Sequence, residues 1–401
     1  MRIAYITDTY LPETNGIVTA IVHHSRGLAS RGHEFLICCP EYGADDPGSS
    51  NDIRIHRFPA HSARSNAETH VAVPPYRTLT RLLKDFAPDL VHVHTPLPIG
   101  VTGIVVARRL GIPLVHTYHS YMPGFLQYAS PPRLLGIDRP HHKDDSRLAW
   151  FLTRLVLNPS NLVLAPSRAM CAGLERHGVT APVSYQTNGI DRVEFPPKTD
   201  WSLRQRIVHT GRLGYEKNAD VVVEAFARFA AGRPGWELHL LGEGPAEAHL
   251  RGLIDRLGIG DRVRFEGFVS RTYLAESYRT GDIYATASTI ETQGLVVLEA
   301  MASGTPVVGV DALAVPEMAR HGEHGLIVRP YDPDAMAQAF ATLADDDALR
   351  ERMGRACIKG AAEHDLDVAI ALLEEHYTGC SAGLYRRHMR ASTKRTPDRR
   401  D

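Results

Sequence analysis

The chain contains 401 residues, of which 43% are hydrophobic and 23% are charged, and its formal net charge is -1. This length exceeds what one ordinary hydrophobic core supports, so we expect two globular domains. A net charge so close to zero argues against a protein that works by general attraction to nucleic acid.

Cysteine usage and the lack of long apolar runs indicate the compartment. The cysteines are odd in number and lack CxxC spacing, which is typical of reduced, buried thiols; they are Cys38, Cys39, Cys171, Cys357 and Cys380. No segment offers the roughly eighteen consecutive apolar residues of a membrane span, and the signal-peptide pattern is missing from MRIAYITDTY. We therefore expect a cytoplasmic protein with at most a peripheral contact at the inner face of the plasma membrane.

The N-terminal segment predicts a strand at Arg2–Asp8, a turn-rich loop that ends at Gly16, and a helix from Ile17 to Ser30. Strand, glycine-bearing loop and helix in this order suit a phosphate at the carboxyl edge of a parallel sheet. One glycine is a weak signal, however, and a helix start that needs a flexible residue is the better explanation of Gly16 taken alone.

Strands and helices continue to alternate through the first half of the chain. We expect them at 34–39, 53–58, 76–86, 90–94, 99–110, 113–117, 148–157, 162–165 and 183–186, with another helix that Ser167 caps. Such repeated units predict a doubly wound parallel sheet. Pro196 and Pro197 mark a linker, so the first domain should span residues 1–195 and the second residues 196–365.

Two consecutive strands of this sheet end in histidines. One carries His92 and His94, and the next carries His116 and is followed by His119. The carboxyl ends of neighbouring parallel strands meet at one edge, where ligands bind in such folds. No acidic or cysteine partner follows at zinc-site spacing, so we expect no metal and interpret His92, His94 and His116 as structural.

An irregular segment follows His119 directly. Residues 121–146 hold four prolines among histidines and charged residues. A long loop inside a compact domain is usually functional or disordered. We interpret it as part of an acceptor site, with a mobile surface loop as a comparable alternative.

The second half begins again with a strand at 206–210, the turn GRLGYEKN and a helix at 219–230. Arg212 and Lys217 flank this turn. Two cations beside a helix start suit a diphosphate, because arginine offers a planar fork and lysine a point charge. Surface salt bridging is the better explanation of an isolated arginine and lysine.

Glu291 and Glu299 bracket another predicted helix start. The polar loop ETQG precedes an apolar run, so this helix should begin at about Gly294. Unpaired N–H groups and the positive end of the helix dipole stabilise a phosphate there, and glycine lets the anion approach closely. The two carboxylates can face different hydroxyl groups of one sugar nucleotide, although a solvated helix edge explains most isolated glutamate pairs.

The end of the chain differs in character. Residues 386–401 are basic and without periodicity, which is typical of a disordered, solvated tail. Contact with an anionic membrane surface is the alternative interpretation.

Four stretches together resemble one enzyme family. DTYLPETNG, HTYHS, HTGRLGYEKN and E-x7-E followed by EAMASGTPVV resemble the retaining glycosyltransferases of family 4, over nearly the whole chain. ETQG, DTYLPETNG and HTYHS resemble the branch of the diacylglycerol glucosyltransferases and phosphatidylinositol mannosyltransferases. The resemblance implies the α/β GT-B fold, in which two Rossmann-like, doubly wound parallel-sheet domains face a cleft, and a last helix, here 366–385, crosses back to the first domain.

The resemblance also assigns chemistry to four residues. Glu291 would contact the transferred sugar, and His119 would touch it and help to place the acceptor. Arg212 and Lys217 would bind the diphosphate. Lys217 would also stabilise the charge that grows on the leaving group, an electrostatic contribution that is often the largest in catalysis.

The remaining implied contacts bind the donor. Glu299 would hold the ribose hydroxyls. The backbone at Gly16, Gly294 and Leu295 would approach the diphosphate. Phe268 and Val269 would hold the nucleotide base. Three positions depart from the family pattern: Gln293 where many relatives have an aromatic residue, Thr187 where proline is common, and Asn218 where glycine is frequent.

The implied reaction is retaining transfer of a hexosyl group from a nucleoside diphosphate sugar to an acceptor hydroxyl, with a UDP-sugar favoured and GDP-mannose as the alternative. We find no convincing general base, which fits the front-face mechanism suggested for the family, in which the leaving phosphate takes the acceptor proton. No cofactor or metal is expected, because Arg212, Lys217 and helix N-termini can neutralise the diphosphate.

The acceptor stays open at this point. The motif branch and the basic tail favour a lipid, whereas the charged residues 139–147 favour a small polar acceptor such as a cyclitol or an aminoglycoside-type natural product. Two further classes remain, a sugar-nucleotide 2-epimerase and a non-catalytic sugar-nucleotide-binding protein. The intact set of charged site residues disfavours the second.

Overall fold

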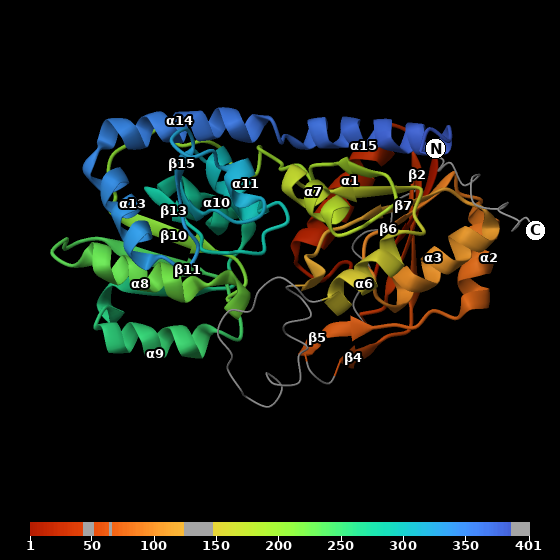
Figure 1. The fold of residues 1–401 in the computed structure, drawn as a ribbon, viewed down its shortest axis with the longest axis horizontal. Coiled ribbons are helices and arrows are strands. Elements are labelled where there is room, and N and C mark those ends of the chain that lie inside the picture. Colours follow the sequence, from red (N-terminus) through yellow and green to blue (C-terminus); the bar gives the residue numbers. More distant parts are fainter. Residues whose placement is uncertain (43–51, 64–65, 124–146, 386–401) are drawn as a thin grey trace, which may run out of the picture.

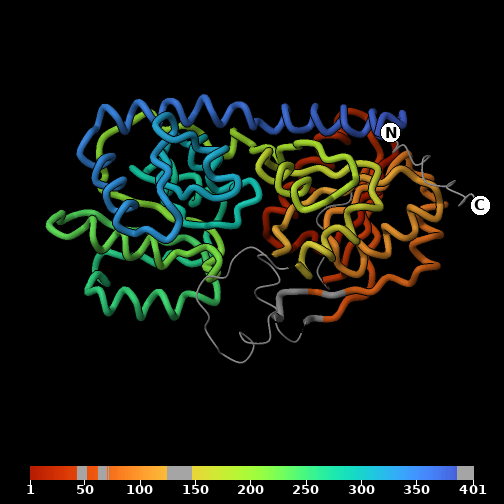
Figure 2. Tube along the Cα trace, in the orientation of Figure 1, coloured from red at the N-terminus to blue at the C-terminus, as the bar shows by residue number. Residues whose placement is uncertain are grey.

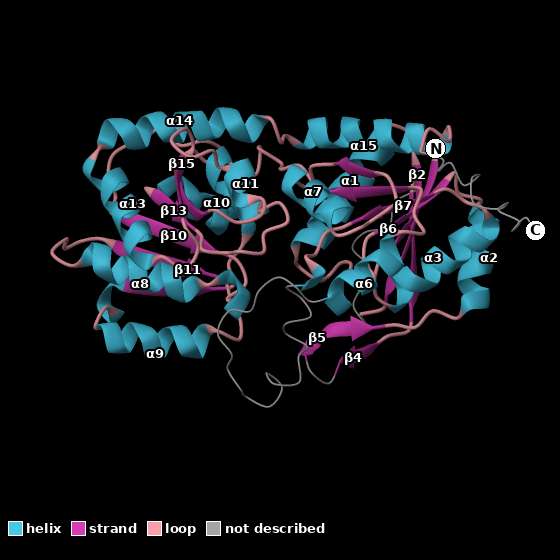
Figure 3. Ribbon diagram, viewed as in Figure 1, coloured by secondary structure: helices cyan, strands magenta, loops and turns pink. Residues whose placement is uncertain are grey.

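Two parallel sheets, each with helices on both faces, form the two halves of the protein (Figures 1 and 3). The structure is a computed structural model that describes residues 1–42, 52–63, 66–123 and 147–385. The first sheet has seven strands in the order β3-β2-β1-β6-β7-β8-β9, and the second has six in the order β12-β11-β10-β13-β14-β15. Strand order reverses beside β1 and beside β10, as in doubly wound sheets. The predicted fold class is confirmed.

The first sheet and its helices occupy the N-terminal half. In chain order they are β1 (Arg2–Ile6), α1 (Gly16–Ala29), β2 (Glu34–Pro40), β3 (Ile53–Phe58), α2 (Tyr76–Phe86), β6 (Leu90–Val93), α3 (Pro98–Leu110), β7 (Leu114–Thr117), α6 (Arg147–Leu157), β8 (Leu162–Ala165), α7 (Arg168–Arg176) and β9 (Val183–Tyr185). A separate antiparallel pair is formed by β4 (His61–Ala63) and β5 (Asn66–Val71).

The second sheet begins after residues 186–205, which form no helix or strand. Its elements are β10 (Arg206–Thr210), η1 (Tyr215–Lys217), α8 (Ala219–Ala230), β11 (Glu237–Leu241), α9 (Glu247–Leu257), η2 (Gly260–Arg262), β12 (Val263–Gly267), α10 (Arg271–Thr280), β13 (Ile283–Ala285), α11 (Leu295–Ala302), β14 (Val307–Val310), α12 (Val315–Met318), β15 (Gly325–Val328), α13 (Pro333–Asp345), α14 (Asp347–Ala362) and α15 (Leu366–Ser381).

The first strand is shorter than predicted for a physical reason. β1 ends at Ile6, and Asp8 leaves the sheet to cap α3, where its carboxylate accepts hydrogen bonds from the amides of Ile99 (2.7 Å) and Gly100 (3.1 Å). An aspartate satisfies the unpaired N–H groups of a helix start in this way. The predicted cap of α7 also forms, because the Ser167 side chain accepts a hydrogen bond from Met170 N.

The last helix covers the first sheet rather than the second. α14 packs on α11, and α15 continues past it onto α1, so the C-terminal helices run along both halves (Figure 2). Ile370, Leu373 and Tyr377 share one buried cluster with Ile3 and Ile21 of the first half. The C-terminal helix therefore ties the two halves together. Residues 386–401 and most of 121–146, on which expectations were placed, lie outside the described residues.

Truncating Leu373 should measure this tie. Leu373 is fully buried against the first sheet, so Leu373→Ala should lower the free energy of unfolding by about 2 to 5 kcal/mol. Val368 on the same helix is half exposed, and Val368→Ala is the matched control, with an expected change below about 0.5 kcal/mol. Chemical denaturation measures both. Equal effects of the two variants would contradict the packing of α15.

Candidate active site

The start of α11 is the centre of the candidate site. Gly294 caps this helix in a left-handed conformation (φ 79°, ψ 59°), and a Cβ added there would stand 3.3 Å from Val297 Cγ2. This conformation strains any residue with a side chain, which accounts for the glycine. The helix therefore presents its first N–H groups beside a bare backbone, an arrangement that suits an anion. Leu295 begins the helix, as the sequence predicted to within one residue.

Lys217 and Glu291 form an ion pair beside this helix start, with Nζ and Oε1 2.6 Å apart. Burial alone would lower the pKa of Lys217, but the Glu291 carboxylate outweighs it and raises that pKa above its ordinary value. Burial would likewise raise the pKa of Glu291, but the Lys217 ammonium lowers it overall. Both groups are therefore charged at neutral pH, and each is the counter-ion of the other.

The Lys217 turn is held in place by a residue that departs from the family pattern. Asn218 follows the turn with φ 49°, the left-handed region where glycine is frequent, and asparagine is among the few other residues that tolerate it. Its side-chain amide donates to the carbonyl of Ala287 (3.1 Å), just beyond β13. Asn218 thus fixes the Lys217 turn against the strand that leads to Glu291.

Glu299 lies in a second charged group one to two turns further along α11. Its carboxylate accepts hydrogen bonds from Arg271 Nη1 (3.1 Å) and from the Tyr278 hydroxyl (3.2 Å). Burial nevertheless raises the pKa of Glu299 above its ordinary value. Arg271 also pairs with Glu194 (2.5 Å), which precedes the second sheet in the chain.

His119 follows the end of β7 in the first sheet. Its Nε2 lies 3.0 Å from His94 Nδ1, and the two rings stack. Burial, with the nearby His24 and His116, lowers the pKa of His119 to about 3. The imidazole is therefore neutral at any ordinary pH, and His94 fixes its orientation.

Contacts between the halves converge on the loop between Glu291 and α11. The Thr292 hydroxyl donates to the His119 carbonyl (2.8 Å). Gln293 is buried; its carbonyl accepts from Asn188 N (3.0 Å), and its amide donates to the Thr187 hydroxyl (2.6 Å). Two departures from the family pattern, Thr187 and Gln293, are thus partners of each other.

The other predicted donor residues lie around the same edge. Gly16 is close to α11, since a Cβ there would stand 3.6 Å from Leu295 Cδ1. Arg212 is exposed in the turn before Lys217. Phe268 is 69% exposed after β12, where its amide donates to Glu243 (3.2 Å), while Val269 is partly buried against the core. The structure therefore brings Gly16, His119, Lys217 and the segment 291–299 close to one another. Arg212 and Phe268 lie at the exposed margin of this site.

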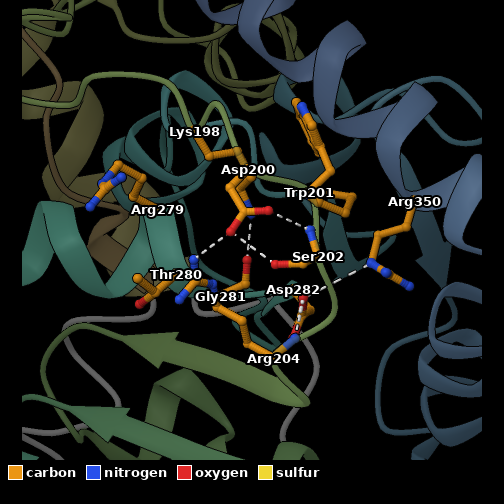
Figure 4. A pocket seen from close by; sticks show the side chains of 11 residues that line it. Lys198, Asp200, Trp201, Ser202, Arg204, Arg279, Thr280, Gly281, Asp282 and Arg350 are labelled. Atoms are coloured by element: carbon orange, nitrogen blue, oxygen red, sulfur yellow. Dashed lines mark hydrogen bonds and ion pairs between the residues drawn. The ribbon is translucent and has the colours of Figure 1, made fainter.

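A pocket at the opposite edge of the second sheet is a different feature (Figure 4). It lies at the amino ends of the strands, where Lys198 donates to the Gly281 carbonyl (2.5 Å) and Asp282 accepts from the amides of Arg204 and Arg206. Burial lowers the pKa of Lys198 to about 8. These contacts hold the linker against the sheet, and none of the predicted site residues lines this pocket.

Sequence reasoning did not find Arg271, Thr292 or Gln293 as site residues. Arg271 is 28 positions from its partner Glu299, and Thr292 and Gln293 bond to the other half of the chain. The one available signal was the simultaneous departure at Thr187 and Gln293. Among the residues that the structure describes, no group of three His, Cys, Asp or Glu side chains is placed to hold a metal ion.

Two family descriptions match the chain. "Glycosyltransferase Family 4" matches residues 14–194, and "Glycosyl transferases group 1" matches residues 192–359. Together they cover both sheets.

Characterised relatives cover most of the chain. The alpha-monoglucosyldiacylglycerol synthase of Streptococcus pneumoniae is 29% identical over 77% of this chain and 70% of its own. A GDP-mannose-dependent alpha-mannosyltransferase of Mycolicibacterium smegmatis is 28% identical over 98% of this chain and 100% of its own. The D-inositol 3-phosphate glycosyltransferase of Thermomonospora curvata is 30% identical over 73% of this chain and 71% of its own.

The fold also matches solved structures. Sucrose-phosphate synthase from Thermosynechococcus elongatus superposes with a TM-score of 0.75 at 21% identity, over 95% of this chain and 99% of that one. No helix in the described part of the chain is both long and apolar enough to cross a membrane.

The buried histidines predict an acid-sensitive fold. Burial lowers the pKa of His24 to about 4 and that of His116 to about 3, and it holds the pKa values of His92 and His94 well below 6.5. Below pH 6.5 the unfolded chain binds protons that the folded chain does not bind. The free energy of unfolding should therefore fall as the pH drops from 6.5 towards 4, by about 1.4 kcal/mol per pH unit for each histidine.

Denaturation at several pH values measures this slope. His116→Phe removes one such histidine and should flatten the slope by about one proton, whereas His249→Phe, at an exposed position, should leave it unchanged. An identical slope in parent and His116→Phe would contradict the assignment.

Proposed function

Because the chain belongs to the glycosyltransferases of family 4 and transfers a sugar from a nucleotide sugar to an acceptor, we propose that it is a retaining hexosyltransferase that needs no metal. The observation that carries this proposal is the ion pair of Lys217 and Glu291 at the glycine-capped start of α11. One cation, one anion and a helix N-terminus meet there within the reach of a single sugar diphosphate.

The diphosphate binds between the start of α11 and Lys217. The amides of Gly294 and Leu295 and the charges of Lys217 and Arg212 neutralise the phosphates, which removes the need for a metal ion. Lys217 is already charged and held by Glu291, so it requires little reorganisation when negative charge grows on the leaving diphosphate. Gly16 approaches the same phosphates from the first half, where it lies against Leu295.

The transferred sugar lies between Glu291 and His119. Glu291 accepts hydrogen bonds from its hydroxyl groups. His119 is a weak proton acceptor, because a group whose pKa is about 3 binds protons poorly at neutral pH. We therefore assign His119 a hydrogen-bonding role. The acceptor hydroxyl gives its proton to the leaving phosphate, so the new glycosidic bond forms on the same face of the sugar as the bond that breaks. The anomeric configuration is retained.

The nucleoside lies towards α10. Glu299 accepts from the ribose hydroxyls, and Arg271, which now pairs with it, keeps Glu194 as its other partner. Phe268 and Val269 border the base. A UDP-sugar is the favoured donor, and GDP-mannose is the alternative, in line with the glucosyl and mannosyl relatives.

A lipid hydroxyl is the favoured acceptor, since the relative from Streptococcus pneumoniae is named for a glucosylated diacylglycerol. The inositol phosphate relative keeps a small polar acceptor as the alternative. The protein would then act in the cytoplasm at the inner face of the plasma membrane.

A donor panel tests the proposal. UDP, GDP, ADP and TDP with their common sugars are compared by thermal shift, with and without a chelator, because a ligand of the native state raises the melting temperature. We expect one nucleotide to raise the melting temperature clearly more than the others, and we expect the chelator to leave this shift unchanged. In Glu299→Ala the affinity for that donor should fall about tenfold or more, while Glu276→Ala, at an exposed position of α10, should bind as the parent does.

Other outcomes of the panel would contradict particular parts of the proposed function. A shift that disappears with the chelator would contradict metal independence, and unchanged affinity in Glu299→Ala would contradict the ribose assignment. Epimerised nucleotide sugar as the product would favour a 2-epimerase, and donor binding without any turnover would favour a binding protein.

His119→Ala separates binding from transfer. The side chain contacts the sugar and not the nucleotide in our assignment, so nucleotide affinity should stay within about threefold while the transfer rate falls at least about tenfold. Single-turnover assays measure the rate and calorimetry the affinity. A normal transfer rate would return His119 to a structural role.

A further inference from the structure

The histidine that we place beside the sugar has a second histidine as its own partner. His119 Nε2 lies 3.0 Å from His94 Nδ1, and the ring centroids are 5.3 Å apart. An imidazole has two ring nitrogens, so this contact leaves Nδ1 of His119 as the nitrogen that meets a substrate. His119 is partly exposed, whereas His94 is buried. His94 therefore acts on a ligand only through His119.

The ring of His94 is held by two aromatic neighbours. The ring of His92 lies against it with centroids 4.0 Å apart, and the ring of Tyr5 meets it at 4.5 Å with an angle of 64° between the planes. Tyr5 belongs to β1, which pairs with β6 so that Tyr5 is opposite His92. These contacts restrict the orientation in which His94 meets His119.

The orientation of His92 is fixed in turn, because both of its ring nitrogens are engaged. Its Nδ1 lies 2.5 Å from the Tyr377 hydroxyl, and its Nε2 lies 2.7 Å from the Thr117 hydroxyl. The Tyr377 hydroxyl also bonds to the Tyr5 hydroxyl (2.9 Å). Tyr377 belongs to α15, which packs on β6 (Figure 1). The C-terminal helix thus supports the rings of His92 and His94 through Tyr377.

The contact between His94 and His119 joins two neutral rings. Burial lowers the pKa of His94 well below 6.5 and that of His119 to about 3, so each ring has one N–H at neutral pH. A hydrogen bond needs a donor, so one ring donates and the other accepts. The direction of this bond determines which nitrogen of each ring carries the proton.

The surroundings of His94 Nε2 decide that direction. This atom is buried and has no hydrogen-bond partner in the part of the chain that the structure describes. Proteins leave a buried N–H without an acceptor more rarely than they leave a buried acceptor without a donor. We propose that His94 carries its proton on Nδ1 and donates a hydrogen bond to Nε2 of His119, which fixes His119 in the tautomer whose Nδ1 carries the proton.

This inference rests on the proposed function and gives His119 a direction within it. A ring with an N–H at Nδ1 donates a hydrogen bond to an oxygen of the sugar or of the acceptor. It has no lone pair on that nitrogen to take up a proton, so the tautomer, in addition to the low pKa, makes His119 unsuitable as a general base. His94 is then a positioning residue that sets what His119 offers to the substrate.

NMR of the ring nitrogens tests the tautomer directly. Long-range proton–nitrogen correlations in the full-length protein with isotope-labelled histidine show which ring nitrogens carry a proton at neutral pH. The signals of the two rings are identified by their loss in His119→Ala and in His94→Leu. We expect a protonated Nδ1 and a bare Nε2 in both rings. A protonated Nε2 in His119 would overturn the proposal.

Substitutions of His94 separate its N–H from its bulk. The amide nitrogen of asparagine is as many bonds from the backbone as Nδ1 is, so His94→Asn should keep kcat within about threefold of the parent. His94→Leu fills the space without a donor and should lower kcat at least about tenfold, with nucleotide affinity within about threefold of the parent. His116→Leu is the matched control, since His116 is as buried as His94 and lies on the neighbouring strand. It should transfer as the parent does.

Three kinetic outcomes would contradict the proposal, once melting temperatures show that the variants fold. They are a parental kcat in His94→Leu, equal losses in His94→Asn and His94→Leu, and a loss in His116→Leu as large as that in His94→Leu. If His94→Leu does not fold, His94→Asn and the spectrum of the parent decide the matter. A parent that transfers no sugar would contradict the proposed function, while its spectrum would still decide the tautomer.

Discussion

The ion pair of Lys217 and Glu291 is the interaction on which the candidate site depends. An ammonium or a carboxylate removed from water needs a partner of opposite charge. Lys217 and Glu291 are each other's partners, with Nζ and Oε1 2.6 Å apart. The pair keeps both groups ionised before any ligand arrives. In the proposed function, a sugar diphosphate exchanges contacts with charges that are already in position, which lowers the cost of reorganising the site.

That pair has its place because elements from both halves hold the surrounding loop. Asn218 fixes the lysine turn, Gly294 allows the backbone to turn into α11, and Thr292 and Gln293 bond to His119 and to the end of the first sheet. α15 adds a second connection on the far side. The loop between Glu291 and α11 is thus held partly by contacts with the first half, so its conformation depends on how the two halves meet.

Much of this was predictable from the sequence, because the relevant signals are local. Apolar runs, the Ser167 cap, the glycine before α11 and the histidines at two strand ends depend on neighbouring residues, and the structure confirms the elements and caps that they predict. Partners distant in the chain were not predictable. Nothing near Arg271 in sequence indicates Glu299, because that contact arises only when α10 and α11 pack together, and nothing near Gln293 indicates Thr187, because that contact arises only when the two halves meet. The length of β1 was overestimated for the same reason, because Asp8 caps a helix that begins ninety residues later.

The most direct test of the central claim compares two affinities for the preferred nucleotide, that of its diphosphate and that of its monophosphate. Both are measured by calorimetry in the presence of a chelator. If the start of α11 and the Lys217–Glu291 pair form the diphosphate site, the diphosphate should bind at least about tenfold more tightly than the monophosphate, and Lys217→Gln should remove most of that difference. Equal affinities for the two nucleotides would mean that the second phosphate is not bound there, and the account of this site would be wrong.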